Sequence, residues 1–518
     1  MPGKLTLVIE PWHAELQAFL DAIKQSCRQG GSIAFTLSVP DLLIDRVATD
    51  GTWSLFRPED VPGLASTHGQ EFNDLYTSFE QRSLATSTYP AKDFWAVISL
   101  SIWDTDSPSI TYKDIINCES RDSASISLYT IPEETACCNN AAISLVHFIK
   151  RDTSEFDFSA LHNVATILTR DLNHIIFANN FPTQRTYEGA IRHRAIGVGV
   201  IGLADVFTAL RLPYESSEAL QLSSNIMQTI YHASLEESHE LTATYGLHFT
   251  FTYSPASFGT FDFNHWPHEI EKRYDWSGLA ERIKEDGLCN AQVTTVSDFS
   301  TFARIASVSE GVLPRENIVF VHSTCPFLND SNIIHKTLST HSYNVINPAL
   351  VEDLERLDIW NDEILSQIIE AEGNAISRYS SYLPFEFRPI SWHISGSVQD
   401  IVSIPRHIKE LYKTAWEVSP EYIMKHARHR APFVSHSESL VLYHENPPHS
   451  WIVRDPHQLL KLFTQPNIFH RNSQHKMLSL AKESDLKTAL YTIRRKTPLP
   501  AHCITESKAI GLSSLKSM

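Results

Sequence analysis

Short apolar runs rich in β-branched residues alternate with helical patterns at the start of the chain. Residues 5–9 and 33–39 form two such runs, and both are typical of strands. Between them, residues 12–26 carry apolar side chains at helical spacing. Pro40 then stands at a favoured first position of a further helix. This order predicts a parallel sheet with helices outside it, which is an α/β fold.

Helical spacing dominates the middle of the chain, from residue 156 to residue 245. Within it, Ser216, Ser217 and Glu218 precede an apolar pattern and predict a capped helix start. Residues 369–404 are rich in Ser, Pro and aromatic residues and predict a loop or insertion. We expect one large domain in residues 1–500, followed by a flexible tail in residues 501–518.

Composition narrows the class of protein. The 518 residues are 42% hydrophobic and 20% charged, which is ordinary for a soluble globular protein. The net charge of -17 argues against non-specific binding to nucleic acid, which needs a basic surface. No stretch reaches the roughly 18 apolar residues of a membrane span, and no secretory signal pattern is present. We therefore expect a cytoplasmic protein that contacts neither nucleic acid nor membrane.

The cysteine and histidine residues match no metal motif. The seven cysteines are scattered and form no CxxC, which indicates a reducing compartment rather than a disulfide framework. The 25 histidines form neither HExxH nor a paired Cys/His spacing. From the sequence we expect no metal and no other cofactor.

Gly197, Gly199 and Gly202 match the pattern GxGxxG. A dinucleotide site would need a strand before the glycines, a helix after them and an acidic residue about 20 positions on. Here a basic Arg-His-Arg triplet precedes them, and the nearest acidic residues come too early, at a helix start. The glycines instead predict close approach between a helix and a sheet, or between two helices.

A longer motif contains these glycines. Residues 192–205 read RHRAIGVGVIGLAD, and other motifs stand in the same chain: EPWH at 10–13, WSL at 53–55, PGL at 62–64, YKD at 112–114 and LYKTAWE at 411–417. Together they resemble the large subunit of class I ribonucleotide reductase over nearly the whole chain. The resemblance implies a ten-stranded α/β barrel of two parallel halves, with a central finger loop and many surrounding helices.

The resemblance also implies that the reducing chemistry is lost. In the family, a finger-loop cysteine holds a thiyl radical that takes the ribose 3′ hydrogen, and that position here is Pro132. Glu134 keeps the position of the family's proton-handling Glu, whereas Thr130 replaces its Asn. Cys138 matches one of two reducing thiols, whose partner would precede the matched part of the chain. The alternative role of Cys138 is that of a small buried apolar residue.

Substrate binding and radical transfer depart from the family as well. The family's phosphate turn reads Pro-Thr-Ala-Ser, and here it is matched by Asp298, Phe299, Ser300 and Thr301. Asp298 would bring negative charge to the phosphate; alternatively, it simply caps a helix. Phe299 takes the place of a residue with a hydroxyl group. The adjacent tyrosine pair of the radical path is reduced to Tyr491 followed by Thr492. In the tail, Cys503 stands alone where the family has a CxxC.

The family's ATP-cone, specificity loops and first barrel strands precede the position that matches Gly3. The resemblance therefore implies an incomplete barrel. Its unpaired strand edges are expected to pair with another protein or with a second copy of the chain. Alternatively, the chain is a shortened version of a longer product.

These departures predict a catalytically inactive large-subunit-like protein. Such degenerate copies resemble those of herpesviruses, which implies a place in the host cytoplasm or the virion and a role against host defence. Its expected partners are a host protein, a reductase subunit or a second copy. Two alternatives stay open: an active or accessory reductase subunit that supplies deoxyribonucleotides, and a nucleotide binder using Ser300, Thr301 and Glu134. The aromatic residues within 379–392 form either an interface or a small core under a loop.

Overall fold

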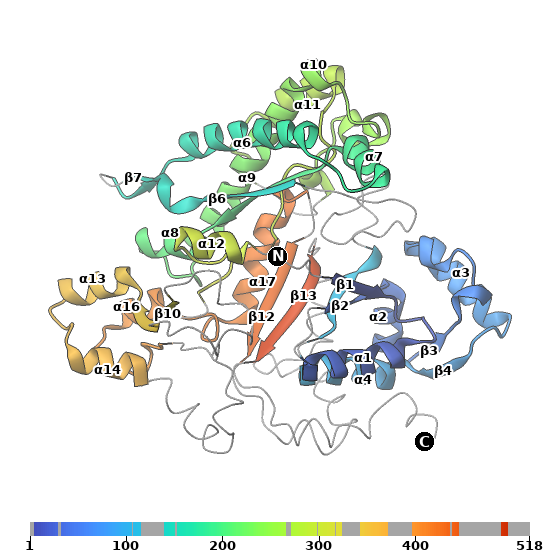
Figure 1. Cartoon of the computed structure of the whole chain (residues 1–518), viewed down its shortest axis with the longest axis horizontal. Coiled ribbons are helices and arrows are strands. Elements are labelled where there is room, and N and C mark those ends of the chain that lie inside the picture. The colour runs from blue at the N-terminus through green and yellow to red at the C-terminus, as the bar shows by residue number, and fades with distance from the viewer. Residues whose placement is uncertain are drawn as a thin grey trace.

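The computed structural model describes residues 5–29, 33–105, 107–114, 139–150, 153–265, 271–297, 299–315, 318–323, 342–370, 396–435, 438–444 and 488–495. Its strands are β1 (Leu5–Ile9), β2 (Ile33–Val39), β3 (Thr52–Leu55), β4 (Ser87–Pro90), β5 (Ser109–Tyr112), β6 (Asn139–Ser144), β7 (Ile149–Lys150), β8 (Glu155–Phe156), β9 (Ile196–Ile201), β10 (Val319–Ser323), β11 (Ser342–Ile346), β12 (Glu438–His444) and β13 (Thr488–Arg495). Its α-helices are α1 (Leu16–Gln29), α2 (Asp41–Ala48), α3 (Gly69–Gln81), α4 (Ala91–Thr105), α6 (Phe158–Ala178), α7 (Gln184–His193), α8 (Leu203–Ala209), α9 (Ser217–Glu240), α10 (Thr242–Tyr245), α11 (Trp276–Asp286), α12 (Ser300–Ala306), α13 (Pro348–Arg356), α14 (Asp362–Glu370), α16 (Arg406–Leu411) and α17 (Pro420–Arg430). Helices surround several sheets (Figure 1), so the predicted α/β class is confirmed.

The N-terminal region has the predicted βαβ order. Strands β1 and β2 pair in parallel, and β5 pairs in parallel with β2 on its other side. Helix α1 begins at Leu16, so the predicted start at Trp12 is wrong. The reason is a competing pairing: Phe56 N–H donates to the Trp12 carbonyl at 2.8 Å, and Ala14 N–H donates to the Phe56 carbonyl at 2.8 Å.

Two sets of parallel strands run in opposite directions. The five-stranded sheet has the order β1-β2-β5-β13-β12, in which β13 is antiparallel to β5 and parallel to β12. Single backbone bridges extend the contacts: Val198 of β9 pairs with Thr294, and Val296 pairs with Glu438 of β12. The pair β6–β9 is thereby joined to the larger sheet. Within the described residues no sheet closes on itself, so the incomplete barrel stays a prediction.

The centre of the chain is helical, as predicted, but it is interrupted by strand β9. The residues of β9 form a continuous apolar run, which period alone does not distinguish from a buried helix. The capped start of α9 is confirmed, because Ser216 Oγ accepts a hydrogen bond from Ala219 N–H at 3.1 Å. Helix α9 is buried along most of its length and packs beneath α6, where Thr169 Oγ1 donates to Ser234 Oγ at 3.0 Å.

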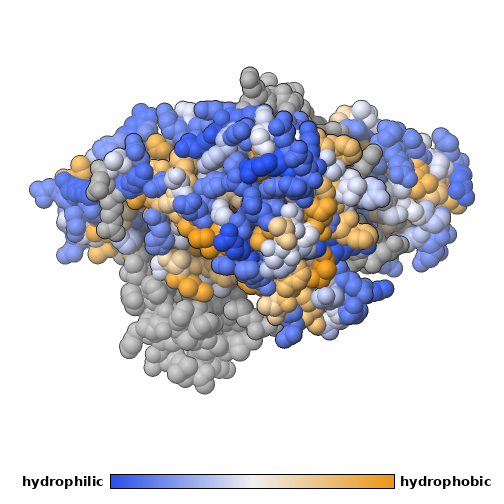
Figure 2. Space-filling model, turned by 90° about the horizontal axis from the view of Figure 1, so that it is seen from above, coloured by the Kyte–Doolittle hydropathy of each residue, from blue (hydrophilic) through white to orange (hydrophobic). Residues whose placement is uncertain are grey.

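Some predicted segments lie outside the described residues. These are the aromatic cluster within 379–392 and the tail, so both stay predictions together with the domain boundary at residue 500. Residues 396–404 contain turns and no helix or strand, in keeping with a loop. In the part of the chain that is described, no helix is both long enough and apolar enough to cross a membrane. The face seen in Figure 2 is mostly hydrophilic, with hydrophobic areas between the polar ones.

Three separate sequence motifs meet around one buried ammonium group. Lys113 of the YKD motif donates to Glu10 Oε2 of the EPWH motif at 2.8 Å and to the Leu64 carbonyl of the PGL motif at 3.2 Å. Trp12 Nε1 donates to the same Glu10 oxygen at 2.6 Å. The Lys113 side chain is 4% exposed, and burial raises the pKa of Glu10 although Lys113 opposes the shift. The motif residues here hold the N-terminal elements together.

Substitution of Lys113 tests this role. Lys113→Met is expected to lower the free energy of unfolding by about 3 kcal/mol or more, because it leaves the Glu10 carboxylate buried without a cation. A second change, Glu10→Gln, should restore part of that loss by removing the unpaired charge. Urea unfolding of the two single variants and the double variant measures both effects. A loss below about 1 kcal/mol in Lys113→Met would contradict the structural role.

Candidate functional site

The predicted site positions are described to different extents. Thr130, Pro132, Glu134, Cys138 and Asp298 lie outside the described residues, and their roles stay predictions. Tyr491 and Thr492 lie in β13, where the backbone is described; Tyr491 pairs with Leu440 of β12 and with Ile110 of β5. Phe299, Ser300 and Thr301 are described with their side chains. The candidate site is therefore built from β6, β9 and the start of α12.

Strand β9 is the central element of this site. It pairs in parallel with β6 from Asn139↔Ile196 to Ser144↔Ile201. On its other edge, Val198 N–H donates to the Val293 carbonyl at 2.8 Å, and Thr295 N–H donates to the Val198 carbonyl at 3.1 Å. Every residue of β9 is buried. A strand that is buried on both faces needs the continuous apolar run that β9 carries.

The first two glycines of the GxGxxG pattern lie inside β9 and make room for neighbouring side chains. A Cβ on Gly197 would lie 2.3 Å from Asn140 Oδ1 and 2.7 Å from Thr295 Cγ2. A Cβ on Gly199 would lie 2.2 Å from Phe299 Cε2. Because these glycines sit within the strand and not in a loop after it, they do not form a dinucleotide turn. The predicted close approach of a helix to a sheet holds for Gly199, whose neighbour Phe299 directly precedes α12. Gly197 is instead approached by Asn140 of β6 and by Thr295.

Phe299 occupies the candidate phosphate turn. The residue is 4% exposed and packs with Ile201 and Ala303 over β9. Helix α12 begins at the next residue, Ser300, and Thr301 is exposed. Backbone N–H groups and hydroxyls at a helix start can hold a phosphate. The Phe299 ring adds no donor at this place and fills the space that Gly199 leaves open.

The polar residues of the longest motif hold loops in place. Arg194 adopts the left-handed conformation at the end of α7 and donates to the carbonyls of Gly246 at 2.7 Å and Leu247 at 3.0 Å. Asp205 accepts from Ser309 N–H at 2.6 Å and from Arg315 Nη2 at 2.5 Å. These contacts fix the chain on both sides of β9. The motif therefore identifies a scaffold, and none of these contacts requires a substrate.

The structure also brings together three side chains that the sequence did not predict as a group. His162 of α6 lies beside His232 and Glu236 of α9. Burial lowers the pKa of His232 to about 4. The spacing of four residues between His232 and Glu236 places both on one face of a helix, and this was the available sequence signal. His162 comes from a different helix, 70 positions away from His232, and only the packing of α6 on α9 shows its position.

Comparison with known proteins identifies the scaffold. The family model of the ribonucleotide reductase barrel domain matches residues 2–491. The ribonucleoside-diphosphate reductase large subunit of Danio rerio is 33% identical over 460 residues, which cover 86% of this chain and 53% of the relative. The large chain of Neurospora crassa is 33% identical over 460 residues, 86% of this chain and 46% of the relative. Large chain 2 of Saccharomyces cerevisiae is 33% identical over 464 residues, 86% of this chain and 49% of the relative. The chain thus spans about half the length of the curated relatives it matches.

A pair of glycine substitutions tests the packing of β9. Gly199→Ala is expected to lower the free energy of unfolding by about 1–3 kcal/mol, because its Cβ meets the Phe299 ring. In a Phe299→Ala background the same change should cost at least about 1 kcal/mol less. Gly197→Ala is the matched control, since its Cβ meets Asn140 and Thr295 instead. Chemical denaturation measures the cost of each of the two glycine substitutions in the unchanged chain and in the Phe299→Ala background. Equal costs of Gly199→Ala in the two backgrounds would contradict the contact with Phe299.

Proposed function

The chain belongs to the ribonucleotide reductase large-subunit family, and from this premise we propose that it is a catalytically inactive member that acts through contacts with other proteins. The family assignment concerns the scaffold, which includes the contacts of Lys113, Arg194 and Asp205. The loss of activity concerns a different set of positions. These are the positions that would bind the nucleotide and carry the radical.

The position of Phe299 is the observation that carries the proposal. Its ring packs against β9 immediately before α12. The resemblance matches this position to a hydroxyl residue of the family's phosphate turn. A diphosphate needs hydrogen-bond donors and a polar surrounding at this place. A buried phenyl ring offers neither. Without this hydroxyl, the turn would keep as donors only Ser300, Thr301 and the backbone N–H groups at the start of α12.

Two changes in the radical path support the same conclusion. Pro132 has no thiol, so it cannot hold the thiyl radical that begins reduction in the family. Thr492 has no phenol and cannot relay a radical after Tyr491. Glu134 and Cys138 keep residue types that match the family, yet neither supplies the missing radical. On this reading, three separate requirements of the reaction are unmet: the phosphate turn, the radical residue and the relay.

We further propose that the strands belong to an incomplete barrel of the family type. The bridges from β9 through Val296 to β12 give a continuous strand order of β6, β9, the segment around Val296, β12, β13, β5, β2 and β1. The buried ion pair between Arg430 of α17 and Glu438 of β12 fixes this junction. Arg430 Nη1 also donates to Ser223 Oγ of α9 at 3.2 Å. The strands β1, β2 and β5 run in one direction, and β12 and β13 run in the opposite direction. Two parallel sets of opposite direction are consistent with a barrel made of two halves.

Exposed aromatic residues support an interaction role. Phe177 at the end of α6 stacks on Tyr245 at 4.5 Å between ring centroids, and both Phe177 and Leu247 are exposed. Phe249 is 71% exposed, with the Arg192 guanidinium 5.1 Å from its ring centroid. Aromatic and arginine side chains are enriched at protein interfaces. The partner would be a host protein, a reductase subunit or a second copy of the chain.

The pattern of loss also supports a placement among herpesvirus-type large-subunit-like proteins. In that case the protein would act in the host cytoplasm or from the virion, and its contacts would modulate host defence. The alternative is an active or accessory reductase subunit that supplies deoxyribonucleotides, and the names of the relatives favour this function. Enzyme activity separates the two proposals directly.

A reductase assay tests the proposal. The purified chain, supplied with a competent small subunit, an effector nucleotide and dithiothreitol, is expected to form no dCDP from CDP above background. The Danio rerio large subunit, assayed in parallel with a matching small subunit, serves as the positive control. Reproducible dCDP formation by the chain would contradict the inactive assignment and favour the alternative.

The variant Pro132→Cys makes the test sharper. It places a thiol at the proposed radical position, but Phe299 still stands in the candidate phosphate turn and Thr492 still takes the place of the second tyrosine. We therefore expect the variant to remain at background in the same assay. Measurable turnover by Pro132→Cys would mean that the substitution at this one position accounts for the loss of activity. Phe299 and Thr492 would then not prevent the reaction, which contradicts the proposal.

A further inference from the structure

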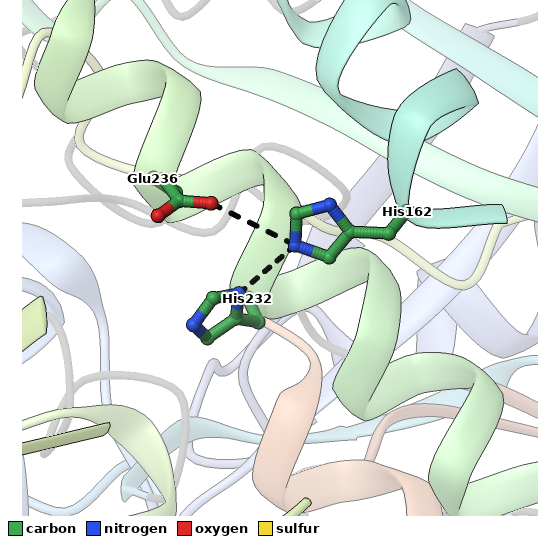
Figure 3. A group of neighbouring side chains, drawn as sticks. All are labelled: His162, His232 and Glu236. Carbon is green, nitrogen blue, oxygen red and sulfur yellow. Dashed lines mark hydrogen bonds and ion pairs between the residues drawn. The ribbon is translucent and has the colours of Figure 1, made fainter. Parts of the chain in front are cut away.

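A compact group of potential metal ligands lies between α6 and α9. Figure 3 shows the side chains of His162, His232 and Glu236 pointing toward one another from the two helices. His232 and Glu236 are one helical turn apart on α9, and His162 faces them from α6. None of the three belongs to the motifs that identify the family. Their arrangement therefore has no explanation in the nucleotide chemistry.

The distances between the ligand atoms fit one shared metal ion. All three ligand atoms lie within 4.8 Å of one another. His162 Nε2 is 3.0 Å from His232 Nδ1 and 3.8 Å from Glu236 Oε2. Ligands about 2.0–2.1 Å from a tetrahedral zinc ion are separated from each other by about 3.3 Å. The two distances from His162 Nε2 differ from that spacing by about 0.3 and 0.5 Å, and the ligand atoms of His232 and Glu236 lie within 4.8 Å of each other.

Neighbouring side chains hold two of the ligands in position. Tyr274 stacks on the His232 ring at 4.4 Å, and Trp276 meets that ring edge-on at 5.1 Å. Arg282 donates to Glu236 Oε1 at 2.9 Å, while the other carboxylate oxygen, Oε2, is the one nearer His162. Residues that orient a ligand from behind in this way are usual around metal sites. Arg282 also brings positive charge, which moderates the affinity expected for a cation.

We propose that His162, His232 and Glu236 bind one divalent transition-metal ion of the zinc class and thereby join α6 to α9. Two imidazoles and one carboxylate suit zinc and similar ions, whereas Mg²⁺ and Ca²⁺ prefer oxygen ligands throughout. Three protein ligands leave a fourth position for water or another ligand. The side chains of His162 and Glu236 are 20% and 34% exposed, so an ion can enter from the solvent.

Titration of the full, untagged chain with Zn²⁺ tests the proposal. After treatment with a chelator, the protein is expected to bind one Zn²⁺ by calorimetry and to melt at a higher temperature in its presence. Loss of a residue that only orients a ligand weakens metal binding about 10- to 100-fold. His162→Asn and Glu236→Gln remove direct ligands, so each should weaken binding by about 100-fold or more. Far-UV circular dichroism confirms that both variants are folded.

Matched substitutions on the same helices serve as controls. His174→Asn lies three turns further along α6, and Glu218→Gln lies in the first turn of α9, about five turns from Glu236. Both should bind Zn²⁺ as the unchanged chain does. Co²⁺ provides a second measurement on the unchanged chain, because tetrahedral Co²⁺ absorbs visible light strongly and Zn²⁺ should displace it. Absence of saturable binding, or equal binding by ligand variants and controls, would overturn the proposal.

Discussion

Strand β9 can be buried between close neighbours because two of its residues have no side chain. The positions of Gly197 and Gly199 are filled from neighbouring elements by Asn140, Thr295 and Phe299, at distances that any Cβ would violate. This close approach places β9 between β6 and the segment that leads to α12. It also fixes Phe299 at the helix start. One packing constraint thus shapes both the scaffold and the candidate phosphate turn.

On the proposed function, this chain keeps the family's scaffold and has lost the family's reaction. Residues that resemble the family and are retained, such as Lys113, Arg194 and Asp205, are engaged in contacts within the fold. Such contacts stabilise the chain whether or not a nucleotide binds. The positions that the resemblance assigns to the reaction, such as Pro132 and Thr492, carry residues that would lack the required chemistry. The exposed surface around Phe249 and the group of His162, His232 and Glu236 are features that the reductase reaction does not explain.

Local patterns in the sequence were sufficient to predict those helices and strands whose ends are marked by their own residues. β1 and β2 follow from β-branched runs, and the start of α9 follows from the Ser216 cap. β9 was missed because a continuous apolar run with glycines has the same pattern in a buried strand and a buried helix. The later start of α1 depends on pairing with Phe56, and the position of His162 beside His232 depends on helix packing. Both contacts join residues distant in sequence, so no local pattern encodes them.

Equilibrium dialysis of CDP against the purified chain tests most directly whether Phe299 has replaced the phosphate site. If Phe299 replaces a donor of the phosphate turn, as proposed, we expect no saturable CDP binding. The Danio rerio large subunit provides the positive control under the same conditions. Saturable binding that is weakened by Ser300→Ala or Thr301→Val would show a working phosphate turn beside Phe299 and would contradict the account.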